Sequence, residues 1–255
     1  MQNYNSMELM IVVASRCIED GTIVGVGTGA PCAAAMLAQH SQAPDSVIMF
    51  EAGGISPVLP TMPVSVGDSR TYYKAVMASG MCEIMETCQR GLVDYTFLGG
   101  AQIDMYGNLN STVVGDWKKP KVRFPGSGGA NDFASFCWKI MVITPHDIKR
   151  FVEKVSFITT PGYLTGPGAR EKAGLPPGTG PFKVITDMAV MGYDSKTKRM
   201  QVESIHPGFT FDDVQKNTGF ELLKSNEMTQ TPYPTETELE TLRKKVDPKG
   251  YIIGR

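Results

Sequence analysis

The chain has 255 residues, of which 42% are hydrophobic, and its formal net charge at pH 7 is −1. This length and composition suffice for a sizeable core, and the near-balance of charge argues against a nucleic-acid-binding surface. No segment approaches the roughly 20 apolar residues of a membrane-spanning helix, and the first residues do not resemble a secretory leader.

Helices and strands are predicted to alternate along most of the chain. Asn5 with Glu8 predicts a capping box at the start of a first helix, and Thr235 with Glu238 predicts a second one. Apolar runs predict strands, whereas runs with helical periodicity or an initial proline predict helices. We expect strands at 22–26, 47–50, 94–100, 121–126, 138–144 and 155–160, and further helices at 31–40, 82–90, 146–155 and 236–246.

This alternation predicts an α/β fold with an open, largely parallel sheet and helices on both faces. The C-terminal part is expected to be less regular. Residues 161–181 are rich in proline and glycine, and the segments 181–194 and 199–207 flank a polar turn that predicts a hairpin. No linker interrupts the pattern, so we expect a single domain over residues 1–255.

Cysteine and histidine are few and show no functional spacing. The five cysteines include no C-x-x-C pair, and none of the three histidines is spaced from another like a metal ligand. Reduced, buried cysteines are the simplest interpretation. We therefore predict a cytoplasmic protein with no metal site.

The stretch "GVGTGA" has two interpretations. Gly25, Gly27 and Ala30 match the G-x-G-x-x-A turn of dinucleotide-binding folds, and Glu51 follows the next strand about 20 residues later. In that hypothesis the protein is an NAD-binding oxidoreductase and Glu51 binds a ribose. The commoner explanation is a tight strand-to-helix turn, and the residues alone leave both open.

Three predicted strands end in a carboxylate or in glycines. The residues at these ends are Glu51, Gly99, Gly100, Gly126, Gly128 and Gly129. Ligands of open α/β sheets bind beyond the carboxyl ends of the strands, so these ends can line one crevice. Backbone N–H groups at such turns can stabilise an oxyanion, and a held carboxylate can act as a nucleophile.

A longer pattern identifies a family. The stretch "GGAQIDMYGNLNSTVVGDWKKPKVRFPGSGGAND" resembles the class I coenzyme A transferases, most closely the β (B) subunits of the glutaconate type. The segments "DGTIVGVGTGAP", "APDSVIMFEAGG" and "PGYLTGPGARE" extend the resemblance over most of the chain.

The resemblance implies a chemistry for the strand ends. Glu51 matches the glutamate that carries CoA as a thioester between an acyl-CoA and a carboxylic acid. Gly126, Gly128 and Gly129 match the glycine loop that holds the oxyanion and CoA. Gln102, Gly99 and Gly100 are expected along the acyl or pantetheine path. The glycines that follow Glu51 are expected to leave room for the thioester.

The resemblance also implies partners and limits. A homologous α subunit is expected, in a heterodimer or an (αβ)₂-type oligomer, with coenzyme A as a substrate and no permanently bound cofactor. Relatives that perform hydrolysis or decarboxylation of acyl-CoA substrates leave those reactions as alternatives. The acyl group and the acceptor acid are not predicted.

Overall fold

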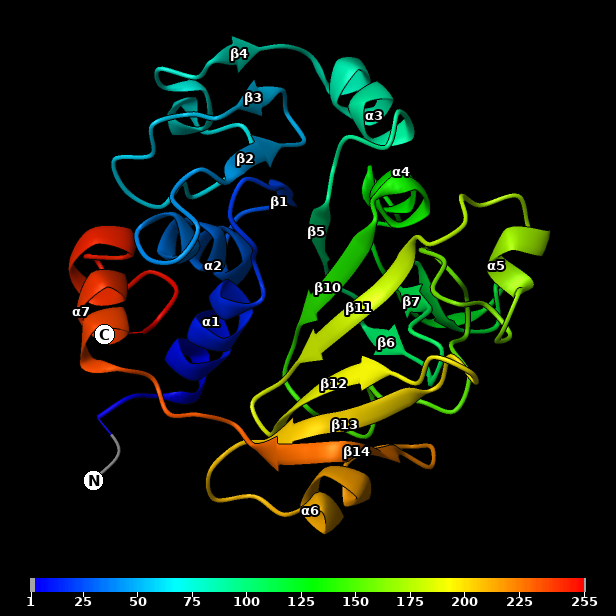
Figure 1. Cartoon of the computed structure of the whole chain (residues 1–255). Coiled ribbons are helices and arrows are strands. Elements are labelled where there is room, and N and C mark those ends of the chain that lie inside the picture. The colour runs from blue at the N-terminus through cyan, green and yellow to red at the C-terminus, as the bar shows by residue number, and fades with distance from the viewer. Residues whose placement is uncertain (1–2, 255) are drawn as a thin grey trace. The chain divides into compact units, whose positions relative to one another are not determined.

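The computed structural model describes residues 3–254 and divides them into two compact units (Figure 1). Unit 1 holds the residues up to Phe97 and those from Tyr233 onward, and unit 2 holds residues 98–232. That the whole chain forms a single domain stays a prediction.

Unit 1 contains short parallel strands with helices between them. Its strands are ordered β4-β3-β2-β1-β5. Strand β1 pairs in parallel with both β2 and β5, whereas β3 and β4 add antiparallel partners at the edge. The elements are α1 (Ser6–Arg16), β1 (Ile23–Val26), α2 (Ala30–Gln39), β2 (Val47–Phe50), β3 (Gly54–Ile55), η1 (Ser69–Tyr72), β4 (Met77–Ala78), α3 (Met81–Gln89), β5 (Tyr95–Leu98), α7 (Glu236–Thr241) and η2 (Leu242–Val246).

Both predicted capping boxes are confirmed. The Asn5 side chain accepts from the Glu8 N–H, while the Glu8 carboxylate accepts from the Asn5 N–H. Thr235 and Glu238 form the same reciprocal pair at the start of α7. The fully buried Glu8 carboxylate also accepts from Nε of Arg243 at 2.7 Å, so the first helix is tied to the last one of the unit.

Unit 2 is built on strands in the order β10-β11-β12-β13-β14, with the small hairpins β6–β7 and β8–β9 beside them. Strands β10–β11 and β13–β14 pair in parallel, and β11–β12–β13 pair antiparallel. The elements are β6 (Gln102–Ile103), β7 (Leu109–Asn110), β8 (Val113–Gly115), β9 (Pro120–Arg123), α4 (Ala130–Phe136), β10 (Lys139–Ile143), α5 (Ala169–Lys172), β11 (Gly180–Ile185), β12 (Ala189–Tyr193), β13 (Met200–Ile205), α6 (Phe211–Lys216) and β14 (Leu223–Gln230).

The predicted α/β class is confirmed, with parallel strand pairs joined through helices and a hairpin, β12–β13, where the sequence predicts one. The strand predicted at 121–126 is present in part as β9, which pairs with β8 in a separate two-stranded hairpin. Within residues 3–254, no helix is long and apolar enough to cross a membrane.

The helix predicted at 146–155 and the strand predicted at 155–160 are wrong. The backbone of this segment binds other parts of the chain: Ile103 N–H donates to the Arg150 carbonyl, and Gly219 N–H donates to the Phe151 carbonyl. Phe151 is fully buried while Ile148 is half exposed, so the apolar residues do not share one helical face. Tertiary hydrogen bonds therefore replace the helical ones that the periodicity predicted.

Two buried histidines connect the last strands of unit 2. His146 contacts the hydroxyls of Thr186 and Thr218 at 3.1 and 2.9 Å and stacks on Phe151. His206 contacts the Thr231 hydroxyl and the Thr186 carbonyl, each at 2.8 Å. Burial lowers the pKa of His146 to about 4 and also lowers the pKa of His206. Both rings are therefore neutral at pH 7.

Because of these histidines, we expect the folded state to lose stability in acid. In the unfolded chain His146 is protonated below about pH 6.5, whereas in the folded chain it stays neutral down to about pH 4. The stability that neutral His146 contributes is therefore fully present above pH 6.5 and is lost as the pH falls towards 4. For His146 alone the loss approaches about 3 kcal/mol. Urea unfolding of the wild type and of His146→Gln, each at neutral and mildly acidic pH, measures it. We expect a smaller pH difference in the variant; equal differences would contradict the assignment.

Candidate active site

Glu51 lies at the carboxyl end of β2. Phe50, the last residue of the strand, is fully buried and is paired with Val26 of the parallel strand β1. Glu51 is half-buried and begins a turn in which the Gly53 N–H donates to the Phe50 carbonyl at 3.0 Å. The register brings Glu51 and the "GVGTGA" turn to the same edge of the strands, as the sequence predicted.

Gly53 and Gly54 pack closely against backbone of the same unit. A Cβ at Gly53 would overlap the carbonyl oxygen of Ser79, and one at Gly54 would overlap that of Thr71. The Gly53 carbonyl accepts from both the N–H and the hydroxyl of Ser79, at 3.0 Å each. Backbone of the same unit therefore fills the Cβ side of each glycine, and the expectation that these glycines leave room for a thioester stays a prediction. The close packing holds the turn that carries Glu51.

In unit 2, Gln102 has a fixed amide orientation. Its Oε1 accepts from Nδ2 of Asn110 at 2.7 Å and from the Ser156 N–H at 3.0 Å. Both bonds use the oxygen, and Nε2 has no acceptor within residues 3–254. The side chain is only 8% exposed, so losing either bond would strand a buried polar group. Gln102 therefore presents an N–H donor of defined direction.

Gly99 and Gly100 form the link between β5 and β6. The Gly100 carbonyl accepts from Nη1 of Arg150, and the next N–H, of Ala101, donates to the Asn110 carbonyl at 2.8 Å. A Cβ at Gly99 would meet nothing within 4 Å, so this residue borders open space.

The glycine loop precedes helix α4. Gly126 and Gly128 have φ of +98° and +51°, which glycine adopts without strain, and Gly129 is the N-cap residue of α4. The Gly126 N–H donates to the Ser111 carbonyl at 2.9 Å, and the Ser111 hydroxyl donates to the Gly126 carbonyl at 3.0 Å. The Gly128 N–H has no acceptor within the described chain. The loop is thus held at Gly126, and the Gly128 N–H is available as a donor.

A polar network joins the glycine loop to Gln102. Asn110, which donates to Gln102, precedes Ser111, whose N–H donates to the Thr159 hydroxyl at 2.8 Å. The Thr159 carbonyl accepts from Nδ2 of Asn131 in the first turn of α4, at 2.9 Å. The structure therefore brings together six predicted site residues in unit 2, and it places Glu51 in unit 1.

Asn110, Ser111 and Thr159 were not predicted as site residues from the sequence. For Asn110 and Ser111 a signal was present in the run of short polar residues "NST" (110–112), which follows the apolar Leu109, whereas Thr159 lies outside this run. Side chains of this type satisfy backbone groups where the chain changes direction. They support the candidate site by fixing its loops.

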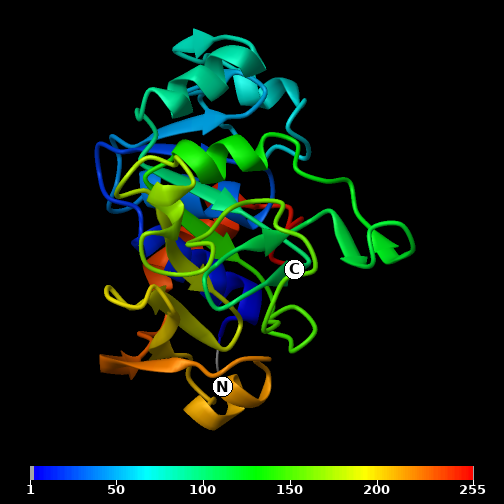
Figure 2. The ribbon, with the colours of Figure 1, turned by 90° about the vertical axis from the view of Figure 1, so that its right-hand side faces the viewer.

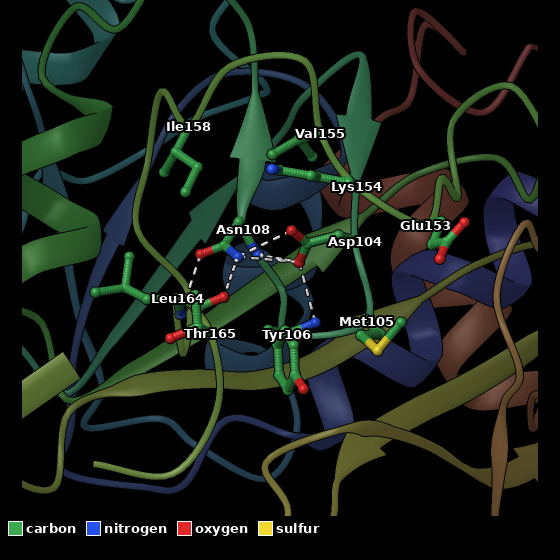
Figure 3. A pocket seen from close by; sticks show the side chains of 10 residues that line it. All are labelled: Asp104, Met105, Tyr106, Asn108, Glu153, Lys154, Val155, Ile158, Leu164 and Thr165. Carbon is green, nitrogen blue, oxygen red and sulfur yellow. Dashed lines mark hydrogen bonds between the residues drawn. The ribbon is translucent and has the colours of Figure 1, made fainter. Parts of the chain in front are cut away.

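A separate cavity of about 410 Å³ lies in unit 2 (Figure 3). Asp104 and Asn108 point toward one another at its wall, with 2.9 Å between Oδ2 and Nδ2. Burial raises the pKa of Asp104. Asn108 also binds the backbone of the next segment, accepting from Gly162 and Leu164 N–H groups. These polar atoms hold the 104–108 turn in place, and none of the predicted site residues lines the cavity.

The comparisons with known proteins agree with these features. The sequence model of a family described as Coenzyme A transferase matches residues 7–217. The B-type chain of the 3-oxoadipate CoA-transferase of Pseudomonas knackmussii is 39% identical, over 95% of this chain and 94% of its own length. The B-type chain of the glutaconate CoA-transferase of Acidaminococcus fermentans is also 39% identical, over 98% of this chain and 96% of its own.

A solved structure extends the likeness to the fold. The crystal structure of glutaconate coenzyme A-transferase from Acidaminococcus fermentans matches with a TM-score of 0.93 and 35% identity, covering 99% of this chain and 98% of that one. The family model and both relatives span most of the sequence, including Glu51, Gln102 and the glycine loop. The chain belongs to the coenzyme A transferase family.

Proposed function

We propose that this chain is the β-type subunit of a cytoplasmic, two-subunit CoA-transferase and that Glu51 carries CoA between two carboxylic acids. The observation that carries the proposal is a glutamate at the carboxyl end of β2, in a chain 39% identical to the B-type chains of two CoA-transferases. Coenzyme A is a substrate in this proposal, and the homologous α subunit completes the enzyme.

The reaction needs only carboxylate and thiol chemistry. The Glu51 carboxylate attacks the thioester carbonyl and displaces the CoA thiolate, forming a mixed anhydride. The thiolate attacks the Glu51 carbonyl, releasing the donor acid and leaving a glutamyl-CoA thioester. The acceptor carboxylate then attacks the glutamyl-CoA thioester and displaces the CoA thiolate, forming a second mixed anhydride. The thiolate attacks the acceptor carbonyl of this anhydride, which gives the new acyl-CoA and restores the Glu51 carboxylate. Every step exchanges one acyl bond for another, with no net change in protons or electrons.

The unit 2 residues suit the oxygen that becomes negative in these steps. The loop formed by Gly126, Gly128 and Gly129 would present the Gly128 N–H to the oxyanion, because fixed backbone dipoles need no reorganisation as the charge develops. Gln102 would direct Nε2 toward the acyl or pantetheine portion, and the open space beside Gly99 suits a passing chain. We propose a dicarboxylic acceptor, since glutaconate and 3-oxoadipate, named for the two relatives, are both dicarboxylates.

Product analysis tests the function. The chain is co-expressed with its α subunit, and the purified complex receives an acyl-CoA with or without a labelled acid: glutaconate, 3-oxoadipate or acetate. We expect label in a new CoA thioester with a dicarboxylate, and no loss of thioester when the acid is omitted. Free CoA or CO₂ formed without an acceptor would instead support hydrolysis or decarboxylation.

A further inference from the structure

The β8–β9 hairpin forms a basic arm, which we define as residues 113–123. Its strands pair through Val113↔Arg123 and Val114↔Val122, and Figure 2 shows the hairpin standing away from the rest of unit 2. Lys118, Lys119, Lys121 and Arg123 are all exposed on it. No function was predicted for this segment from the sequence.

The positive charges of the arm have no carboxylate partners. Within residues 3–254, none of the four cations makes an ion pair. The only acid of the arm, Asp116, accepts from the N–H groups of Lys118 and Lys119 at 2.9 and 3.0 Å and so shapes the turn. Four unpaired cations on so short a hairpin repel one another, and a bound polyanion would relieve that repulsion.

Aromatic contacts hold one of these cations in place. The Arg123 guanidinium lies 4.7 Å from the centre of the Trp117 ring, and its Nη2 donates to the Trp117 carbonyl at 2.8 Å. Trp117 also stacks on Phe157, with ring centres 5.4 Å apart. Part of the side-chain entropy that anion binding would cost is therefore already lost.

The base of the arm is the candidate oxyanion loop. Beyond β9, the Phe124 N–H donates to the Thr112 carbonyl and the Gly126 N–H to the Ser111 carbonyl, both at 2.9 Å. The ladder thus continues from the arm to the glycines. At about 3.3 Å per extended residue, Lys121 lies at most roughly 23 Å along the chain from Gly128. A long substrate with its thioester at the loop can direct its far end to the arm.

We propose that the basic arm binds the phosphate groups at the nucleotide end of coenzyme A. The inference rests on the proposed function, which supplies CoA as the substrate. CoA carries a diphosphate and a 3′-phosphate at the end remote from its thiol, and the arm offers several cations at one end of a site whose other end stabilises an oxyanion. Arg123 supplies a fixed fork for one phosphate, and the three lysines supply mobile point charges.

A charge-matched pair of triple variants tests the arm in the αβ complex. Lys118→Gln, Lys119→Gln and Lys121→Gln together should raise KM for the CoA thioester about tenfold, because three charge-assisted contacts are lost. The kcat should stay within about twofold, since no reacting atom is touched. The control, Lys172→Gln, Lys196→Gln and Lys216→Gln, removes the same charge from exposed sites of unit 2 and should keep the wild-type KM.

Thioesters of 3′-dephospho-CoA, which lack the 3′-phosphate, test whether the arm contacts that phosphate. The wild type should prefer the CoA thioester, and the arm variant should lose most of that preference. An unchanged KM, an equal rise in the control triple, or an arm variant that fails to assemble with the α subunit would each overturn the proposal. Calorimetric measurement of free CoA binding distinguishes failure of the arm proposal from failure of the proposed function. A wild-type complex that binds CoA through the arm but transfers no CoA would refute only the proposed function.

Discussion

Replacing Glu51 with glutamine is expected to lower CoA transfer by the αβ complex on the order of 10⁴-fold or more. The amide nitrogen and oxygen of glutamine do not attack a thioester, so the covalent route is removed. The half-buried side chain keeps its size, and the turn that holds it depends on Gly53, Gly54 and Ser79. Folding and assembly should therefore stay as in the wild type. Initial rates of labelled-acid exchange measure the loss.

Two controls separate chemistry from structure. Glu51→Asp keeps the carboxylate but withdraws it by one methylene, so it should retain measurable transfer well below the wild-type rate. Borohydride reduction after addition of acyl-CoA should convert Glu51 to an alcohol in the wild type only, which peptide mass spectrometry detects. A Glu51→Gln variant that transfers CoA at the wild-type rate, or a thioester trapped on another residue, would show that Glu51 is not the nucleophile.

The parts of the fold that follow local rules could be predicted from the sequence. The capping boxes at Asn5 and Thr235 depend on side chains three residues apart, and β2 depends on an uninterrupted apolar run. Residues 146–155 carry a helix-like pattern but form no helix. Their hydrogen bonds go to Ile103 and Gly219, which are remote in sequence and leave no mark on the local pattern.

The candidate site divides in the same way. Its glycines and Glu51 are visible as strand ends, and the family resemblance gives them roles. The packing of Gly53 and Gly54 against residues 71–79 depends on tertiary contacts, so it could not be predicted from the sequence. The fixed amide of Gln102 likewise depends on Asn110 and on the distant Ser156.

Arg170 shows how a residue outside the predicted site can control it. Its side chain is 1% exposed, and no carboxylate within residues 3–254 pairs with it. Nη2 donates to the carbonyls of Ala134 and Ser135 in the last turn of α4, at 2.6 and 3.2 Å. Nη1 donates to the carbonyls of Pro161 and Gly162, at 3.0 Å each. Burial lowers the Arg170 pKa to about 10, so the group is still charged at pH 7.

These contacts explain how a buried cation without a counterion is stable. Helix C-terminal carbonyls carry partial negative charge, and α4 directs two of them at the guanidinium. The same helix begins beside Gly129, and its first turn is held through Asn131 and Thr159. Arg170 and Asn131 thus hold the two ends of the helix that positions the glycine loop.

Replacing Arg170 with methionine should lower the free energy of unfolding by about 4 kcal/mol, because four carbonyls in or near the core lose their donor. Urea unfolding measures the loss, and Lys172→Met, an exposed change on the same helix α5, should stay within about 0.5 kcal/mol of the wild type.

The variant Arg170→Lys keeps the charge but not the planar fork of the guanidinium, so an intermediate loss of stability is expected. Where the lysine variant is still folded, a displaced glycine loop should lower kcat more than it changes KM, since the oxyanion forms only during reaction. Full stability in Arg170→Met would mean that water satisfies these carbonyls, and an unchanged kcat in Arg170→Lys would mean that α4 holds the loop without this anchor.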